Sequence, residues 1–291
     1  MIPPQFEYYA PTSVDDAVAL LSRFNGEAKV LAGGHSLLPL MKLRLAAPSV
    51  LVDINRIDGL SYIREEGGHL KIGATTRTND LLDSALLHRS YPILTDAAQE
   101  IADPLVRNLG TVGGNVCHGD PGNDLPACMM ALGAVYALAG PEGPRTVPAS
   151  QFYKDTFVTA VEPTELLVEV RIPQAVTRQG SAYHKIEKRV GDFAMAGAAA
   201  RVVLDDSGNV TAAGIGLTGV GATAIHAAKA AAALVGQPAD DAHLLQAAKI
   251  AQEESEPMSD LRGPAEYKRA MAGVLTHRVL SRAVARAKGG A

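Results

Sequence analysis

Two short glycine-rich stretches constrain this chain more than any other feature of its sequence. Residues 31–38 (LAGGHSLL) stand between a β-type run and an apolar helix-like segment, and residues 107–124 (RNLGTVGGNVCHGDPGND) stand between two apolar segments. A pair of glycines lets the main chain approach a neighbour closely and adopt a positive φ. Consecutive N–H groups before a helix form a site for an anion. Two such stretches on successive units predict one large anionic ligand lying between them.

The order of strand-like and helix-like segments predicts three units. Residues 1–56 and 57–175 each read as an α/β unit that contributes one glycine-rich stretch. Residues 176–291 begin with a hairpin that turns at residues 205–209 (DDSGN) and continue as alanine-rich helix. Residues 166–173 (LLVEVRIP) read as an edge or closing strand, because a proline ends them.

Composition limits the classes of function. The chain has 27 Lys and Arg against 31 Asp and Glu and no long basic run, so nucleic acid is not an expected partner. Its only cysteines are Cys117 and Cys128, whereas an iron–sulfur cluster needs about four thiolates. Any such cluster must therefore belong to a partner. No segment is typical of a signal peptide or a bilayer span, which predicts the cytoplasm, with contact to the inner face of the membrane only through partners.

The second glycine-rich stretch has three interpretations, which the residues alone leave open. Cys117, His118, Asp120 and Asp124 are all metal-binding residue types, but their spacing matches no known metal site. The mixture of glycine, proline, asparagine and aspartate is also typical of an ordinary connecting loop.

The third interpretation of this stretch is a cradle made of main chain. Gly113 and Gly114 would let the backbone adopt a positive φ and approach a ligand. Thr111 and Asn115 would add short hydrogen-bonding side chains. Asp124, at an expected helix start, could accept a hydrogen bond from a ribose or ribitol hydroxyl. The first glycine-rich stretch favours this interpretation, because it repeats the same arrangement.

Two further segments need an interpretation. Residues 214–219 (GIGLTG) match the dinucleotide fingerprint G-x-G-x-x-G, but they follow the return arm of a hairpin and no strand comes after the next helix. A nicotinamide site is therefore not expected there. Residues 183–193 (YHKIEKRVGDF) are either a strand with a solvated basic face or a source of one cation and one aromatic ring for a flat cofactor.

A resemblance to a known family rests on four motifs: AGGHSLLPLMKLR (residues 32–44), IADPLVRNLGTVGGN (101–115), HGDPGNDLPA (118–127) and KRVGDFAMAG (188–197). Together they resemble the FAD-binding medium subunit of molybdenum hydroxylases, the xanthine dehydrogenase family, and most closely that of aerobic carbon monoxide dehydrogenases. The resemblance runs nearly end to end. It implies an α+β protein, with an FAD-binding fold of the PCMH/vanillyl-alcohol-oxidase type in two α/β subdomains. A C-terminal domain with a three-stranded antiparallel sheet and helices would follow.

The resemblance also implies where FAD binds. The first glycine-rich stretch would wrap the diphosphate, and the second would make a further contact. Ile101 would lie beside the flavin, and Leu167 and Lys185 would contact the isoalloxazine end. Phe193 stands where close relatives often have Tyr or Trp, so ring cover is expected without a hydroxyl. The implied cofactor-binding residues are Val30, Leu31, Ala32, Gly33, Gly34, His35, Ser36, Leu37, Ile101, Thr111, Gly113, Gly114, Asn115, Asp124, Leu167, Lys185 and Phe193.

The partners and the reaction follow from the same resemblance. A large subunit would hold molybdenum and oxidise carbon monoxide with water to carbon dioxide. A small subunit would hold two [2Fe–2S] clusters, through which electrons would pass singly to the FAD of this chain. The FAD would pass the electrons on to a quinone-type acceptor. The assembly would be a dimer of heterotrimers, and this chain itself would contribute no catalytic residue and no metal site.

Three alternatives remain at this stage. The chain could serve a hydroxylase of an N-heterocycle, an aldehyde or an aromatic acyl-CoA. It could be a free-standing flavin oxidase, with His35 as a covalent flavin tether of the kind found in distant relatives with G-G-H loops. It could also be an interaction subunit that has lost its cofactor. We expect non-covalent FAD, with His35 either donating a hydrogen bond to the phosphate or having no role in binding.

Overall fold

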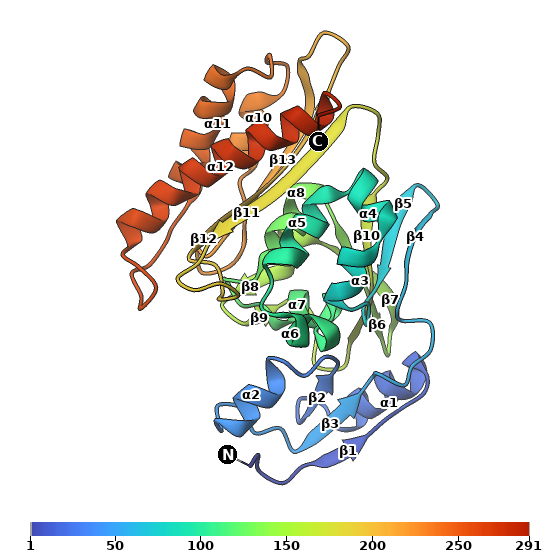
Figure 1. Cartoon of the computed structure of the whole chain (residues 1–291). Helices are drawn as coiled ribbons and strands as arrows, with labels where there is room; N and C mark the ends of the chain where they lie inside the picture. The colour runs from blue at the N-terminus through green and yellow to red at the C-terminus, as the bar shows by residue number, and fades with distance from the viewer. Residues whose placement is uncertain (1, 291) are drawn as a thin grey trace.

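The computed structural model describes residues 2–290, and its sheets succeed one another along the chain (Figure 1). The N-terminal sheet, at the bottom of Figure 1, is parallel and has the strand order β1-β3-β2. Its elements are β1 (Glu7–Tyr9), α1 (Val14–Arg23), β2 (Ala28–Leu31), α2 (Leu37–Lys42) and β3 (Val50–Asp53). Ser13 caps helix α1, and its hydroxyl accepts from the N–H of Asp16 at 3.1 Å. Its buried face packs against this sheet.

The middle unit is built on a five-stranded antiparallel sheet with the order β4-β5-β10-β6-β7. Its strands are β4 (Ile63–Glu66), β5 (His69–Gly73), β6 (Val135–Gly140), β7 (Gly143–Pro148) and β10 (Leu166–Pro173). A separate two-stranded ribbon consists of β8 (Tyr153–Asp155) and β9 (Val158–Thr159). The helices of this unit are α3 (Thr78–Asp83), α4 (Ala85–Ser90), α5 (Pro92–Glu100), α6 (Pro104–Leu109), α7 (Val112–His118), α8 (Asp124–Leu132) and α9 (Ala149–Phe152).

Strand β10 corrects one expectation. It is the central strand of this sheet, between β5 and β6, and not an edge strand. Pro173 is its last residue and lies opposite His69. Because the proline stands at the very end of the strand, its missing N–H removes no bond from the interior of the ladder. The other end of β10 reaches the N-terminal unit, since Leu166 is part of the hydrophobic core beneath β2 and β3.

The C-terminal unit has an antiparallel sheet with the order β11-β12-β13-β14. Its elements are β11 (Gln179–Ile186), β12 (Ala196–Leu204), β13 (Val210–Thr218), β14 (Ile225–His226), α10 (Ala228–Leu234), α11 (Asp241–Glu254) and α12 (Ala265–Ala287). The expected three-stranded sheet is present as β11, β12 and β13, with the two-residue β14 added at its edge. The hairpin between β12 and β13 turns at residues 205–209, as predicted.

Helices α5 and α8 form the layer between the middle and C-terminal sheets (Figure 1). Every residue of α8 is buried. A Cβ on Gly216 would lie 2.0 Å from the carbonyl oxygen of Ala127, and one on Gly214 would lie 2.1 Å from that of Ala131. The glycines of GIGLTG therefore let β13 press against the backbone of α8. This segment is a sheet strand and forms no nucleotide loop.

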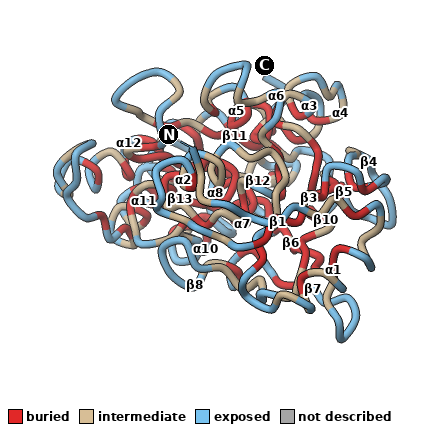
Figure 2. The backbone as a smooth tube through the Cα atoms, turned by 90° about the horizontal axis from the view of Figure 1, so that it is seen from below, coloured by how far each residue is buried: buried red, intermediate tan, exposed pale blue. Residues whose placement is uncertain are grey.

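In Figure 2, which is seen from below, the buried residues lie in the interior and the exposed residues mostly around the periphery. The middle core joins α5, α7 and α8 to β5, β6 and β10, while the C-terminal core lies between its sheet and α10 to α12. The architecture is thus α+β, as expected. The division at residues 56 and 175 into domains stays a prediction.

Candidate functional site

The first glycine-rich stretch forms the connection between β2 and α2. Gly34 has a φ of +74°, a conformation that favours glycine. Within residues 2–290, the N–H groups of Gly33, Gly34, His35, Ser36 and Leu37 donate to no protein acceptor. Donation to the main chain resumes at Leu38, whose N–H bonds to the carbonyl of Gly34 at 3.0 Å. This connection therefore offers a row of free backbone donors.

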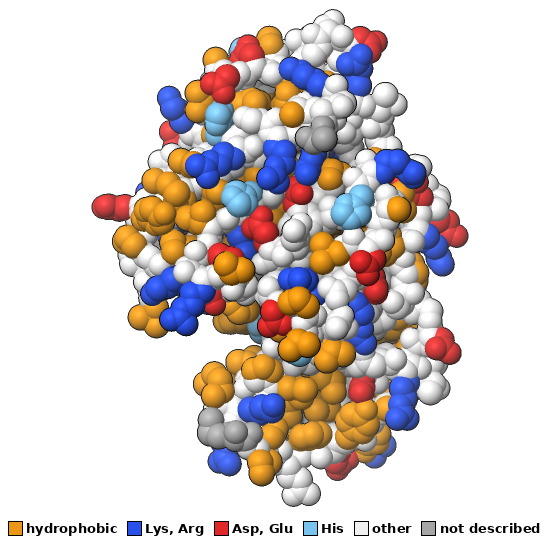
Figure 3. Space-filling view, in the orientation of Figure 1, with side chains coloured by type: hydrophobic (Ala, Val, Ile, Leu, Met, Phe, Trp, Pro, Cys, Tyr) orange, Lys and Arg blue, Asp and Glu red, His pale blue; other side chains and the backbone are white. Residues whose placement is uncertain are grey.

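The structure brings this connection against the second glycine-rich stretch. A Cβ on Gly33 would lie 2.3 Å from the carbonyl oxygen of Leu109 and 2.9 Å from Cα of Gly110. Only a glycine permits this approach of two backbones. In Figure 3 the surface is hollowed at the left, between the N-terminal unit below and the two units above it. Figure 1 places α2 at the lower edge of that hollow.

The second stretch differs from the expected loop. Gly113 and Gly114 lie in the first turn of α7, and neither has a positive φ, so that expectation was wrong. The N–H of Gly113 donates to the carbonyl of Ala74 at 2.8 Å, and that of Gly114 donates to Oγ1 of Thr111 at 3.0 Å. These amides already donate to protein acceptors, so they are not free to bind a ligand as the amides of the first stretch are. Gly113 is needed for packing, since a Cβ there would lie 2.7 Å from the Ala74 oxygen.

The side chains of the second stretch offer more than its backbone. Oδ1 of Asn115 is buried and has no hydrogen-bond partner, whereas buried polar atoms are normally paired. Thr111 is buried and caps α7. Gly114 is exposed, and a Cβ there would touch only Oγ1 of Thr111, at 2.7 Å. Asn115 is thus the member of this stretch with an unused polar group.

Asp124 stands at a helix start, as expected, but as the first residue of α8 and not as its cap. The cap of α8 is Asn123, and Asp124 is the first helical residue, with its carboxylate turned toward β11. That carboxylate is buried, 3.1 Å from Nζ of Lys185, and accepts from the hydroxyl of Tyr183 at 2.5 Å. Burial raises the pKa of Asp124 to about 6, because it penalises the charged form, although Lys185 and Tyr183 oppose the shift.

Lys185 connects this pair to the segment that carries Phe193. Its Nζ also donates to the carbonyl of Asp192 at 2.8 Å and lies 3.3 Å from Oε2 of Glu187. Phe193 is 39% exposed, and the guanidinium of Arg262 lies 5.6 Å from its ring centroid. One aromatic face at the surface is therefore held beside a buried ion pair.

Ile101 and Leu167 belong to the core of the middle unit. Ile101 ends α5 and is 9% exposed, while Leu167 lies on β10 and is 3% exposed. The carbonyl of Ile101 accepts from the guanidinium of Arg107 at 2.9 Å. Both residues are apolar and fixed, the kind of side chain that can border a flat ring.

Two residues of this region escaped the sequence reasoning. Arg77 donates to the carbonyl of Leu109 and to Oδ1 of Asn55, and Asn55 donates to the carbonyl of Ala32. The available signal was their position, because Asn55 follows the end of β3 and Arg77 follows the end of β5. That signal becomes meaningful only once the two strand ends are known to meet.

The metal interpretation finds no support in the geometry. Among residues 2–290, no group of three or more His, Cys, Asp or Glu side chains is arranged to hold a metal ion. Burial also raises the pKa of the Cys117 thiol to about 12, which disfavours the thiolate that a metal would need.

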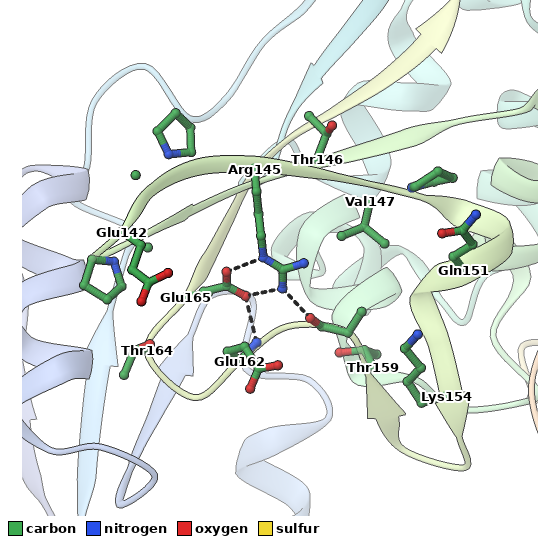
Figure 4. A pocket seen from close by; sticks show the side chains of 16 residues that line it. Glu142, Arg145, Thr146, Val147, Gln151, Lys154, Thr159, Glu162, Thr164 and Glu165 are labelled. Atoms are coloured by element: carbon green, nitrogen blue, oxygen red, sulfur yellow. Dashed lines mark hydrogen bonds and ion pairs between the residues drawn. The ribbon is translucent and has the colours of Figure 1, made fainter.

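A groove lined by other residues lies away from the two glycine-rich stretches. Figure 4 shows it between the β6–β7 hairpin and residues 159–165, with a volume of about 800 Å³. Arg145 crosses it, donating to both oxygens of the Glu165 carboxylate and to the carbonyl of Ala160. None of the residues expected to bind the cofactor lines this groove.

Two family models together match most of the chain. One, described as the FAD binding domain in molybdopterin dehydrogenase, matches residues 4–175, and the other, the CO dehydrogenase flavoprotein C-terminal domain, matches residues 181–283. The chain therefore belongs to the FAD-binding flavoproteins of the molybdopterin dehydrogenases. No helix within residues 2–290 has the length and apolar character needed to cross a membrane.

The similarity to particular relatives extends over the whole length. The chain is 48% identical to the carbon monoxide dehydrogenase medium chain of Afipia carboxidovorans, covering 99% of this chain and 100% of the relative. It is 49% identical to the medium chain from Hydrogenophaga pseudoflava, covering 98% and 99% respectively. The crystal structure of a Cu,Mo-CO dehydrogenase in its cyanide-inactivated form matches with a TM-score of 0.95 at 47% identity, covering 98% of this chain and 100% of that chain.

Proposed function

We propose that this chain carries FAD as the electron-transfer subunit of a molybdenum and iron–sulfur hydroxylase, specifically an aerobic carbon monoxide dehydrogenase. The observation that supports this most is the row of free N–H groups on residues 33–37, held against the turn at Leu109 and Gly110. A diphosphate is the part of FAD that accepts from such a row. Full-length similarity to carbon monoxide dehydrogenase medium chains supports the choice of enzyme.

The residues present fit this cofactor. The free amides of the first stretch would bind the diphosphate, and the unpaired Oδ1 of Asn115 would accept from a cofactor hydroxyl. Asp124 and Lys185, bonded to each other, would lie at the ring end, where Asp124 would offer acceptor capacity while Lys185 holds its carboxylate in place. Ile101, Leu167 and Phe193 would cover the ring and exclude water. When bound, FAD supplies a centre that exchanges one or two electrons.

The same proposal assigns the chemistry on carbon monoxide to partners. A molybdenum-binding large subunit and a small subunit with [2Fe–2S] clusters would supply electrons, and a quinone-type acceptor would remove them. The two cysteines of this chain fit that division, since burial raises the pKa of both thiols and disfavours cluster ligation. Assembly as a dimer of heterotrimers, and a cytoplasmic location at the inner face of the membrane, stay predictions.

Visible absorbance tests whether the protein binds FAD and whether the FAD is held covalently. The purified holoprotein should show a flavin band near about 450 nm, and acid precipitation should release all of the yellow colour to the supernatant. Colour retained in the precipitate would instead indicate a covalent tether at His35, which is exposed. A holoprotein without the flavin band would contradict the proposal.

The substrate that reduces the flavin tests which enzyme this chain serves. Carbon monoxide should bleach the flavin band only when the molybdenum and iron–sulfur partners are present. Bleaching of the complex by an N-heterocycle, an aldehyde or an aromatic acyl-CoA, but not by carbon monoxide, would support the electron-transfer role of this chain. It would assign the chain to a hydroxylase of that other substrate. Bleaching of the isolated chain by a small organic substrate would favour a free-standing oxidase.

A further inference from the structure

A chain of hydrogen bonds joins the two glycine-rich stretches through two side chains. The guanidinium of Arg77 donates to the carbonyl of Leu109 at 2.5 Å and to Oδ1 of Asn55 at 2.7 Å. The side-chain amide of Asn55 then donates to the carbonyl of Ala32 at 2.8 Å. Ala32 is the residue immediately before Gly33. The contact between the two backbones is therefore held from the side by Arg77 and Asn55.

Both side chains are anchored by their own main chain. Arg77 lies opposite Thr111 in a β-bridge, which is closed by the N–H of Thr78 bonding to the carbonyl of Gly110 at 2.9 Å. The N–H of Asn55 bonds to Oδ1 of Asp53 at 2.9 Å, at the end of β3. Arg77 thus belongs rigidly to the second stretch and Asn55 to the first. Their mutual bond is the connection between the two.

Arg77 also carries a charge that the protein leaves without a counter-ion. Within residues 2–290, no carboxylate forms an ion pair with its guanidinium, and no other cationic side chain bonds to residues 32–36 or 109–115. Its two acceptors, the Leu109 carbonyl and the Asn55 amide oxygen, are neutral. A positive charge without a partner, beside a row of free N–H donors, suits a doubly negative diphosphate.

We propose that Arg77 is a positioning residue for the cofactor diphosphate: through its fork to Leu109 and Asn55, it holds the residue 33–37 donors in the binding arrangement. This inference rests on the proposed FAD site and adds a residue to it. Arg77 holds the connection through Asn55 and the Ala32 carbonyl. A lysine could carry the charge but could not bridge both acceptors, because its ammonium lacks the planar fork.

The test removes the bound flavin from the full-length protein and then measures Kd for two flavins, FAD and riboflavin. FAD has the diphosphate and riboflavin lacks it, so a change in the donors should affect FAD alone. We expect Arg77→Gln to raise Kd for FAD about a hundredfold and Arg77→Lys to raise it about tenfold, while Kd for riboflavin changes less than about twofold. A general loss of structure would weaken both flavins equally.

Two further variants sharpen the comparison. Arg145→Gln removes a guanidinium that bridges a carboxylate and a carbonyl far from the glycine-rich stretches, and it should leave both affinities unchanged. Asn55→Ala should weaken FAD binding, and adding it to Arg77→Gln should cause little further loss, because the two residues act in one network.

The inference is overturned by any of three results: unchanged FAD affinity in Arg77→Gln, equal losses for FAD and riboflavin, or full affinity in Arg77→Lys. The proposed function fails separately. If the original protein itself does not bind FAD, the site is wrong; if it binds FAD and the Arg77 variants do too, only the positioning role is wrong.

Discussion

Lys185 on β11 and Asp124 at the start of α8 form a buried ion pair, with 3.1 Å between Nζ and Oδ1 and side chains that are 1% and 7% exposed. The pair joins the C-terminal sheet to the layer of helices beneath it. Both residues are also proposed to face the cofactor. The same contact would therefore hold the C-terminal sheet against α8 and would set the charge at the ring end of the cofactor site.

Replacing Lys185 by Met should destabilise the protein strongly. The substitution leaves the Asp124 carboxylate buried without its cation, and loss of one partner from a buried pair costs about 3–5 kcal/mol. The free energy of unfolding in urea measures the effect. Lys71→Met is the matched control, because Lys71 pairs with Glu66 at the surface and should change stability by less than about 1 kcal/mol. Equal effects of the two variants would contradict the structural role of the buried pair.

The protonation of Asp124 should make stability depend on pH. Its pKa is raised by burial from 3.8 to about 6 in the folded chain, and Glu100 adds to the rise. The folded state therefore holds the proton more tightly than the unfolded state, so this contribution is present below pH 4 and is lost as pH rises to about 6. The loss is about 3 kcal/mol. The difference in unfolding free energy between the original protein and Asp124→Asn, measured from pH 4 to 7, should follow this course; a difference independent of pH would refute it.

A bulky residue at Gly114 should exclude the cofactor without unfolding the chain. Gly114 is exposed, and a side chain there would meet only Oγ1 of Thr111 before entering the space proposed for FAD. We expect Gly114→Leu to purify as a folded protein without the flavin band, with Gly114→Ala retaining more flavin. Flavin content per chain and circular dichroism together measure the outcome. Full flavin occupancy in Gly114→Leu would show that the cofactor lies elsewhere.

Gly216 should matter for packing and not for nucleotide binding. An alanine there would place Cβ 2.0 Å from the Ala127 oxygen, so β13 and α8 would have to move apart. Overpacking of this kind costs about 1–3 kcal/mol or more. Thr211→Ala, an exposed position on the same strand, is the control and should change stability by about 0.5 kcal/mol or less. Titration with NADH should detect no binding in any of these proteins, and saturable binding lost in Gly216→Ala would revive the dinucleotide interpretation.

The sequence by itself determined the local features of this protein. Glycine at positions 33 and 34 predicted a close approach of the main chain after β2, and that approach is present. The hairpin at residues 205–209 followed from its turn residues, and the scarcity of cysteine assigned any iron–sulfur cluster to a partner. Each of these depends on neighbours in the chain, on which local sequence carries direct information.

Only the tertiary structure decided how the two glycine-rich stretches differ. The carbonyl of Ala74 satisfies the N–H of Gly113 in the first turn of α7, while the donors at residues 33–37 have no protein partner within residues 2–290. The burial of Asp124 against Lys185, the central place of β10 and the bond between Arg77 and Asn55 likewise join segments distant in the chain. Glycine composition alone cannot distinguish a free amide from a satisfied one, because the acceptor is supplied by whichever strand end the fold brings beside it.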